Sequence, residues 1–197
     1  MNENLRAFSD NATAAGSNGI VAAPNQTYIS NAGRGVDSKP WVIEDGPIHV
    51  SLTHHPLDVQ ATISFVKNPR AGAVVLFAGT TRDNTADQAV ASLSYTTYPA
   101  LALRTMQSIA SSMLAAHGLT AVSITHRLGL VPVEEESILV AVSAPHRQAA
   151  WKGGEEALEM CKRRLEVWKN EVFEDGSGGW QANQGVSTET ISRDGTE

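Results

Sequence analysis

The sequence is poor in cysteine, in long apolar runs and in excess positive charge, and each of these shortages excludes a class of protein. It holds one cysteine, Cys161, among 197 residues. An internal disulfide framework is therefore excluded, and a reducing compartment is indicated. No apolar run approaches the roughly 18 residues that a membrane-spanning helix needs. A formal net charge of −6 with a pI near 5.5 argues against binding nucleic acid through a basic surface.

The two ends of the chain have compositions that bury little surface. Residues 1–45 are rich in Asn, Ala, Gly and Ser and show no sustained periodicity, so we expect a disordered extension, with docking of the apolar stretch 41–43 left open. The N-terminus lacks the apolar core of a signal peptide and is not Arg-rich like a transit peptide, which favours a soluble, cytoplasmic protein. We expect one domain over 46–184 and a flexible tail over 185–197.

Between these ends, apolar patterns of strand and helix length alternate. Hydrophobic residues make up 42% of the chain, which suffices for a core. The patterns predict a helix with Pro56 in its first turn, helices that begin at Pro99 and near Arg147, and a polar loop over 81–90. The expected strands are 49–53, 72–80, 91–97, 122–128, 138–144 and 166–173. The sum is an α+β, or mixed α/β, domain whose sheet is covered by about three helices.

The segment from Pro145 to Lys169 gathers four cationic or potentially cationic side chains in an acidic protein. His146 and Arg147 stand where a strand passes into a helix, and helix N-termini bind anions. The alternative is that His146 caps the helix and Arg147 is solvated. Lys162 and Lys169 are seven residues apart, which on one continuous helix is about two turns on the same face. Solvated lysines are the alternative reading.

Three further features carry weaker signals. Arg82 follows the predicted buried strand 72–80 and so lies at the rim of the sheet, where ligands often bind, although pairing with a neighbouring aspartate is the alternative. Cys161 lies among apolar helix residues and is more typical of a core cysteine than of a nucleophile. No motif has the ligand spacing of a metal site, and the glycine-rich stretch 176–179 lacks the Lys and Ser of a phosphate-binding loop.

Several stretches together resemble one family, the large, catalytic subunit of molybdopterin synthase. The resemblance covers about residues 48–181, in the order and spacing of the family. The matching stretches are G-A-V-V-L-F-A-G-T-T-R-D-N, L-S-Y-T-T-Y-P-A-L-A, H-R-L-G-L-V-P-V, V-A-V-S-A-P-H-R, and C-K-R-R-L-E-V-W-K-N-E followed by G-G-W.

The resemblance implies an α/β-hammerhead-type domain with an antiparallel sheet, and it implies an enzyme. The implied sulfurtransferase moves two sulfurs onto cyclic pyranopterin monophosphate and makes the dithiolene molybdopterin. The sulfur arrives as a thiocarboxylate on the C-terminal Gly-Gly of a small ubiquitin-like subunit. Two large subunits form a dimer with one small subunit at each end, a heterotetramer, and the resemblance implies neither a metal nor a cofactor.

The resemblance also assigns roles to the cationic residues. Lys162 and Lys169 match the essential lysines, with Lys162 beside the thiocarboxylate and Lys169 in proton transfer or substrate binding. Arg82, His146 and Arg147 become anchors for the cyclic phosphate. Glu134 stands in place of a usual glycine, and Glu166 lies in a stretch that often contains proline. Two other functions stay open: a sulfurtransferase that uses a Cys161 persulfide, and a non-enzymatic module that binds a ubiquitin-like tail.

Overall fold

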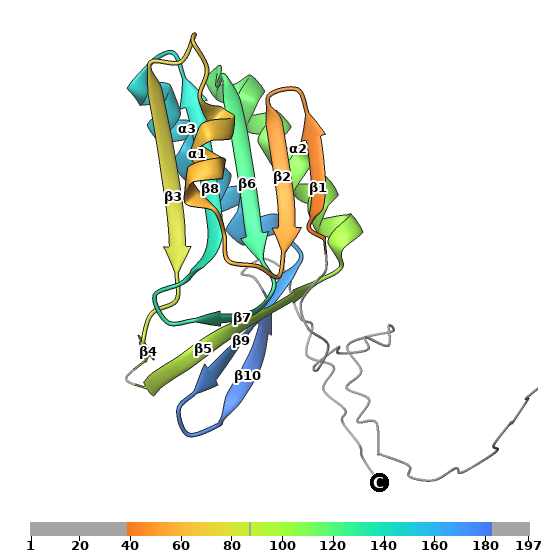
Figure 1. The fold of residues 1–197 in the computed structure, drawn as a ribbon, viewed down its shortest axis with the longest axis vertical. Coiled ribbons are helices and arrows are strands. Elements are labelled where there is room, and N and C mark those ends of the chain that lie inside the picture. The colour runs from red at the N-terminus through yellow and green to blue at the C-terminus, as the bar shows by residue number, and fades with distance from the viewer. Residues whose placement is uncertain (1–38, 87, 183–197) are drawn as a thin grey trace, which may run out of the picture. The chain divides into compact units, whose positions relative to one another are not determined.

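A computed structural model describes residues 39–86 and 88–182. Within them, the larger sheet has five strands in the order β1-β2-β6-β8-β3 (Figure 1). Its strands are β1 (Trp41–Asp45), β2 (Ile48–Thr53), β3 (Ala73–Thr80), β6 (Ala121–Arg127) and β8 (Glu136–Ala144). Neighbouring strands run antiparallel except β2 and β6, which are parallel.

Helices cover both faces of this sheet. The helices are α1 (Val59–Val66), α2 (Pro99–His117) and α3 (Arg147–Arg164). Figure 1 shows α1 on one face and α2 with α3 on the other. Helix α2 packs on β1, β2 and β6, α3 packs on β3 and β8, and α1 packs on β3, β6 and β8. Among the described helices, none covers β1 and β2 on the face that carries α1.

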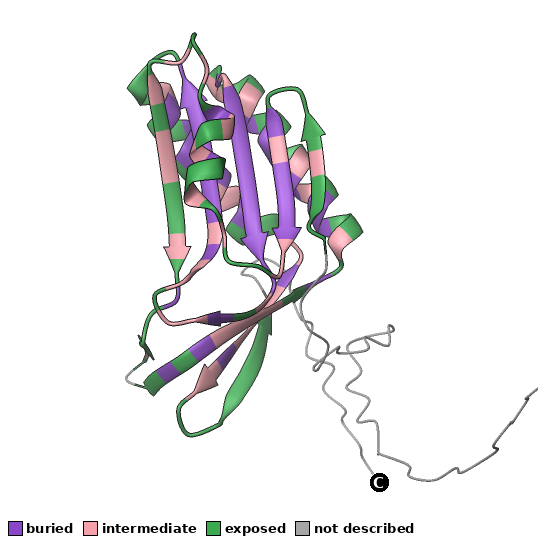
Figure 2. Cartoon of the chain, in the orientation of Figure 1, coloured by how far each residue is buried: buried purple, intermediate pink, exposed green. Residues whose placement is uncertain are grey.

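The core follows from the alternation of side chains along the central strands. Every residue of β6 is buried, and most of β8 is too (Figure 2). Val122, Ile124 and Val142 point toward the α2–α3 side and belong to the main hydrophobic cluster. Ala121 and Ala141 point the other way and form a smaller cluster with Val66 of α1 and its neighbours.

A second sheet carries the C-terminal hairpin. Its strands are β4 (Asn84–Thr85), β5 (Gln88–Thr97), β9 (Val167–Phe173) and β10 (Gly178–Ala182), in the order β10-β9-β5-β4, and β7 (Gly129–Pro132) also pairs with β5. All its pairings are antiparallel. It lies at the end of the larger sheet where β3 ends and β8 begins (Figure 1). This junction positions the candidate site.

Local chemistry sets the ends of two helices. Asp58 caps α1, since its Oδ1 accepts a hydrogen bond from the Ala61 amide at 2.8 Å. The prediction that Pro56 lies in the first turn was wrong, because the cap lies two residues further along and Pro56 precedes the helix. Helix α2 begins with Pro99, as predicted, and ends at Gly118, whose φ of 59° is a left-handed conformation that favours glycine.

The predicted fold class is confirmed: three helices and antiparallel pairing are found in the described part of the chain. Some boundaries were wrong. The expected extension over 1–45 includes β1, which pairs with β2. The expected loop 81–90 contains β4 and the start of β5. The other expectations for the N-terminal extension and the tail 185–197 lie outside the described residues.

Candidate functional site

A cavity of about 220 Å³ opens where the two sheets meet. It is lined from β3, β4, β5, β9 and the segment after β3 by Thr80, Arg82, Thr85, Val90, Leu93, Tyr95, Lys169 and Glu171. Arg82 reaches it because β3 ends at Thr80, and Lys169 reaches it from the third position of β9. Two of the five predicted site residues therefore share one cavity.

Lys169 forms an ion pair with a buried carboxylate. Its Nζ donates to Glu171 Oε1 at 2.8 Å, and the lysine side chain is 34% exposed whereas that of Glu171 is 7% exposed. Because the two residues are separated by one position of a strand, both side chains lie on the same face of the sheet. A carboxylate this buried needs a partner, so the Glu171–Lys169 pair holds a cation at the cavity wall.

Tyr95 stands beside this pair on the neighbouring strand. It is the register partner of Lys169, and Leu93 is the partner of Glu171. Burial raises the pKa of the Tyr95 phenol above its ordinary value, although a hydrogen bond with Ser137 and the charge of Lys169 partly offset this. The phenol therefore stays protonated at neutral pH. Its ring meets the buried His126 ring edge-on, with centroids 4.9 Å apart.

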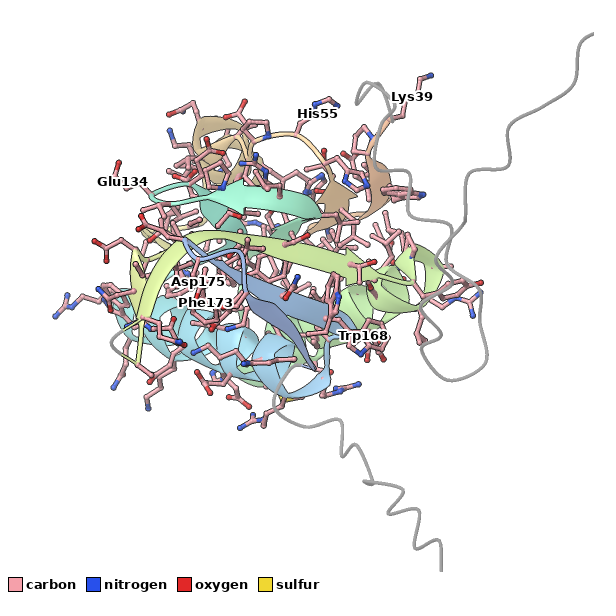
Figure 3. All side chains as sticks on the ribbon, turned by 90° about the horizontal axis from the view of Figure 1, so that it is seen from below. Lys39, His55, Glu134, Trp168, Phe173 and Asp175 are labelled. Carbon is pink, nitrogen blue, oxygen red and sulfur yellow. The ribbon has the colours of Figure 1, made fainter. Side chains whose placement is uncertain are left out.

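A turn between β7 and β8 holds the backbone next to Arg82. The Thr81 amide donates to the Glu135 carbonyl at 3.1 Å, and the Glu134 amide donates to the Thr81 carbonyl at 2.9 Å. The Glu135 carboxylate also forms an ion pair with the buried Arg127. Glu134 has a φ of 70°, and its side chain is exposed and points outward (Figure 3). Glu134 stands where the resembled family usually has a glycine.

Lys162 lies outside this cavity, on the last turn of α3. Its side chain is 56% exposed, and its Nζ donates to Glu159 at 3.0 Å. Only Leu165 and Glu166 connect α3 to β9. Glu166 is held twice: Thr97 donates to its carbonyl, and Thr105 donates to its Oε1 at 3.0 Å. This two-residue link determines how the lysine of the helix and the lysine of the strand are placed.

His146 and Arg147 lie at the opposite end of the larger sheet from Arg82. Antiparallel pairing sets Ala73 of β3 beside Ala144, and Thr80 at the other end beside Glu136. Eight residues of strand at about 3.3 Å each separate the two ends by about 25 Å. His146 precedes α3 without a side-chain capping bond, and both residues are exposed. Within one chain, Arg82 and this pair therefore do not contact the same phosphate.

Close packing fixes the turn that carries His146 and Arg147. A Cβ on Gly72 would lie 2.6 Å from the Pro145 carbonyl oxygen, so the backbone of 72 and that of 145 are in close approach. This contact positions the start of α3 relative to the start of β3.

Cys161 is buried in the main core cluster on α3. Burial raises the pKa of its thiol to about 12. A thiolate, the reactive form, is therefore scarce at neutral pH. Among residues 39–86 and 88–182, no group of three or more His, Cys, Asp or Glu side chains is arranged to hold a metal ion. None of the described helices is long and apolar enough to cross a membrane.

Sequence reasoning missed Glu171 and Tyr95 as members of the cavity. For Glu171 the signal was present, since a carboxylate two positions after a lysine in a strand faces the same way. Tyr95 carried no local signal, because its place depends on the pairing of β5 with β9, which are 70 residues apart in places.

Comparison with known proteins establishes the family of the chain. Residues 52–164 match the family model described as MoaE protein. The chain is 55% identical over 148 residues to the molybdopterin synthase catalytic subunit of Neurospora crassa, which covers 75% of this chain and 72% of that protein. The crystal structure of molybdopterin synthase from Staphylococcus aureus aligns with a TM-score of 0.63 at 31% identity, over 66% of this chain and 94% of that one.

A more distant solved structure has the same fold. It is a complex of subunits 1 and 2 of molybdopterin-converting factor from Helicobacter pylori, and the matching chain aligns with a TM-score of 0.55 at 22% identity, over 64% of this chain and 86% of that one. The family model alone spans more than half of the present chain. This protein is therefore a member of the MoaE family.

Proposed function

We propose that this chain is the catalytic subunit of a molybdopterin synthase. In this role it transfers sulfur from the thiocarboxylated C-terminus of a small ubiquitin-like subunit to cyclic pyranopterin monophosphate. The observation that carries the proposal is the cavity in which Arg82 and Lys169 lie together. The cavity lining holds two cations and one carboxylate, so it is net positive in a protein of net charge −6, which suits an anionic substrate. The reducing compartment indicated by a single cysteine favours the cytoplasm.

The residues of the cavity divide the chemical work. Arg82 offers a bidentate fork to the cyclic phosphate. Lys169, held by Glu171, stabilises negative charge that develops at the pterin side chain and donates or accepts a proton there. Lys162 is exposed one helical turn before the α3–β9 link, where an incoming carrier tail reaches it, and it orients the thiocarboxylate.

His146 and Arg147 act as phosphate anchors in a site completed by a second copy of the chain. Within one chain these residues cannot reach the Arg82 cavity, whereas in the proposed dimer they can reach the cavity of the other copy. The pair lies about 25 Å of strand away from Arg82, yet both residues are exposed and the family resemblance implies a dimer of large subunits. In a two-fold dimer the same surface patch meets its counterpart, so exposed residues from one copy can complete the cavity of the other.

The two other functions are less well supported. A persulfide on Cys161 needs an accessible thiolate, and burial of this thiol with a pKa of about 12 disfavours one. A module that only binds a ubiquitin-like tail needs a groove for the tail. It has no use for an arginine and an ion-paired lysine in a separate cavity.

The proposal is tested by reconstitution. The purified chain is mixed with cyclic pyranopterin monophosphate and with the small subunit in its thiocarboxylate or its plain carboxylate form. We expect the dithiolene product only with the thiocarboxylate. A stable complex of this chain with the thiocarboxylated small subunit that forms no dithiolene product would contradict the proposal. Equal product formation with the plain carboxylate form would contradict it too.

A further inference from the structure

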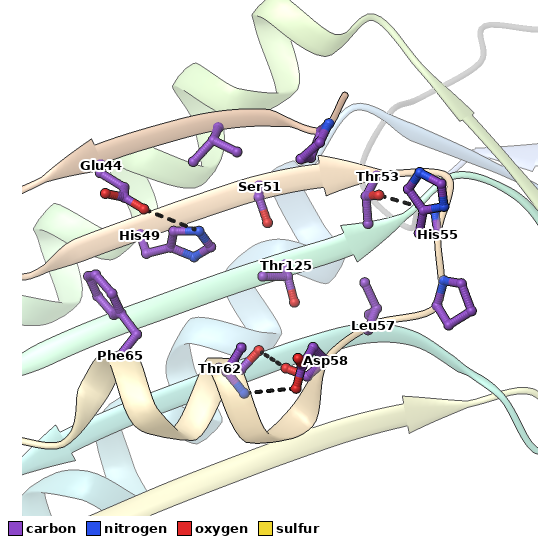
Figure 4. Close-up of a pocket in the computed structure, with 14 residues that line it drawn as sticks. Glu44, His49, Ser51, Thr53, His55, Leu57, Asp58, Thr62, Phe65 and Thr125 are labelled. Carbon is purple, nitrogen blue, oxygen red and sulfur yellow. Dashed lines mark hydrogen bonds and ion pairs between the residues drawn. The ribbon is translucent and has the colours of Figure 1, made fainter. Parts of the chain in front are cut away.

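A second, larger cavity lies on the opposite side of the molecule's main sheet from α2 and α3. It is a groove of about 460 Å³ between α1 and the uncovered strands β1 and β2 (Figure 4). None of its lining residues lines the Arg82–Lys169 cavity. We call it the α1 groove, and it is lined by Pro40, Val42, Glu44, His49, Ser51, Thr53, His55, Pro56, Leu57, Asp58, Ala61, Thr62, Phe65 and Thr125.

The floor of the α1 groove is a row of polar side chains on two parallel strands. Alternation places His49, Ser51 and Thr53 of β2 on this face. Thr125, the register partner of Ser51, lies on the adjacent strand β6. A solvated sheet face is also polar, but Ser51 and Thr125 are each only 7% exposed. These hydroxyls are therefore recessed at the bottom of a groove and do not lie on an open surface.

Two hydroxyl groups of the floor can form further hydrogen bonds. Thr125 Oγ1 is buried and has no hydrogen-bond partner among the residues that the structure describes. Thr53 Oγ1 accepts from the His55 amide and keeps a second lone pair, which can accept a further hydrogen bond. Buried hydroxyls are normally paired, so an unpaired one that lines a cavity points to a polar ligand atom.

The charge of the lining selects the kind of ligand. Glu44 and Asp58 line the groove, and its described lining contains no Lys or Arg. Glu44 lies 3.9 Å from His49 Nε2 with its side chain 67% exposed. His49 Nδ1 is hydrogen-bonded to the Ser123 hydroxyl. Burial lowers the pKa of His49 despite the opposing effect of Glu44, so the ring adds no positive charge at neutral pH. An anionic pterin would find no cation here.

The walls add an apolar requirement. Val42, Leu57 and Phe65 line the groove beside the carboxylates. The Phe65 ring packs against the His49 ring, with centroids 5.2 Å apart, and extends this apolar wall. We propose that the α1 groove binds a small organic cation, namely an ammonium or guanidinium group on a short apolar stem. The stem packs on the apolar walls while the head group meets Glu44 and the hydroxyl floor.

Three probes of similar shape test this assignment on the full chain. n-Butylamine is a cation, n-butanol is neutral and butyrate is an anion. Backbone amide shifts of Ser51 and Thr125 are followed by NMR during titration. We expect saturable shifts with butylamine, binding of butanol weaker by about tenfold, and no saturable shift with butyrate. Equal binding of butylamine and butanol would overturn the proposal, as would amine-induced shifts that do not saturate.

Variants separate a ligand site from a fold effect. Glu44→Gln lies on an exposed rim and should weaken butylamine binding about three- to fivefold without changing the melting temperature. Glu174→Gln, an exposed carboxylate on the distant β9–β10 turn, is the matched control and should bind as the parent does. Equal affinity of the Glu44 variant and the control would refute the assignment.

One further arm identifies the source of the cation. N-acetyl-lysine methylamide carries the same ammonium between two peptide groups. Tighter binding of this compound than of butylamine identifies a lysine side chain of a polypeptide as the occupant, and weaker binding identifies a free amine. Either result supports a cation site in the α1 groove. If neither compound binds, the proposal is refuted.

Discussion

At the residue scale, the site depends on charged groups whose burial differs. Glu171 is buried and paired, Lys169 is half-buried and Lys162 is exposed. These differences fit the separate roles that we propose: a buried pair fixes a cation in place, whereas an exposed lysine can adapt to an arriving partner. The neutral, buried His126 behind Tyr95 serves packing and adds no charge.

His126 predicts a pH dependence of stability. Burial lowers its pKa to about 4, from 6.5 in an exposed histidine. His126 therefore binds a proton more readily in the unfolded chain than in the folded one. The stability that the neutral, buried ring contributes is present above pH 6.5 and is lost as the pH falls toward 4. Between pH 7 and pH 5 this one group should reduce the free energy of unfolding by about 2 kcal/mol.

Urea unfolding at the two pH values measures that loss, and His126→Gln provides the comparison. The variant is less stable at pH 7. The decrease in its free energy of unfolding between pH 7 and pH 5 should be smaller than that of the parent by about 2 kcal/mol. Parallel losses in the two proteins would show that His126 does not titrate in this way.

Cys161 predicts an absence of effect on activity. Replacing it by Ala removes the thiol and leaves a small void beside Leu165, so we expect a loss of stability of about 1–2 kcal/mol. The rate of dithiolene formation at a temperature where the variant is folded should equal that of the parent. Loss of product by a folded Cys161→Ala protein would restore the persulfide mechanism.

At the element scale, the sequence predicted the elements that pattern alone determines. The strand 72–80 and the helix from Pro99 were predicted because an apolar run and a proline with a later glycine are local signals. Strands β1, β4 and β7 were missed because they are short, and pairing with distant strands stabilises them. The separation of Arg82 from His146 and Arg147 needed the antiparallel register of β3 and β8, which no local pattern contains.

The turn before β8 gives a prediction at this scale. Glu134 adopts a φ of 70°, which costs a non-glycine residue about 1–2 kcal/mol, and its exposed side chain does not offset this. Glu134→Gly relieves this strain, but glycine loses more entropy on folding, so the free energy of unfolding should rise by a net of only about 0.5–1 kcal/mol. Differential scanning calorimetry measures the gain, and Glu136→Gly within β8 is the control that should destabilise. A lower melting temperature for Glu134→Gly would contradict the argument.

At the scale of the whole molecule, the roles that we propose for Arg82, His146 and Arg147 at one phosphate would require more than one chain. If a second copy completes each site, an Arg147→Ala chain and a Lys169→Gln chain are inactive alone but complement each other. A re-equilibrated equal mixture holds half mixed dimers with one intact site each, so about a quarter of the parental activity should return. Mixing Arg82→Ala with Lys169→Gln, both in one chain's cavity, should restore nothing. A first mixture as inactive as its components would place His146 and Arg147 outside the site.

The central claim is that the cavity shared by Arg82 and Lys169 is where sulfur transfer takes place. Lys169→Gln tests it most directly, because the amide still donates a hydrogen bond to Glu171 while the positive charge is lost. The measurement is the single-turnover rate of dithiolene formation with thiocarboxylated small subunit, beside Lys67→Gln, an exposed lysine after α1, as control. The account predicts a fall of about a hundredfold or more for Lys169→Gln and no change for the control. A folded Lys169→Gln protein that works within about threefold of the parent rate would contradict the claim.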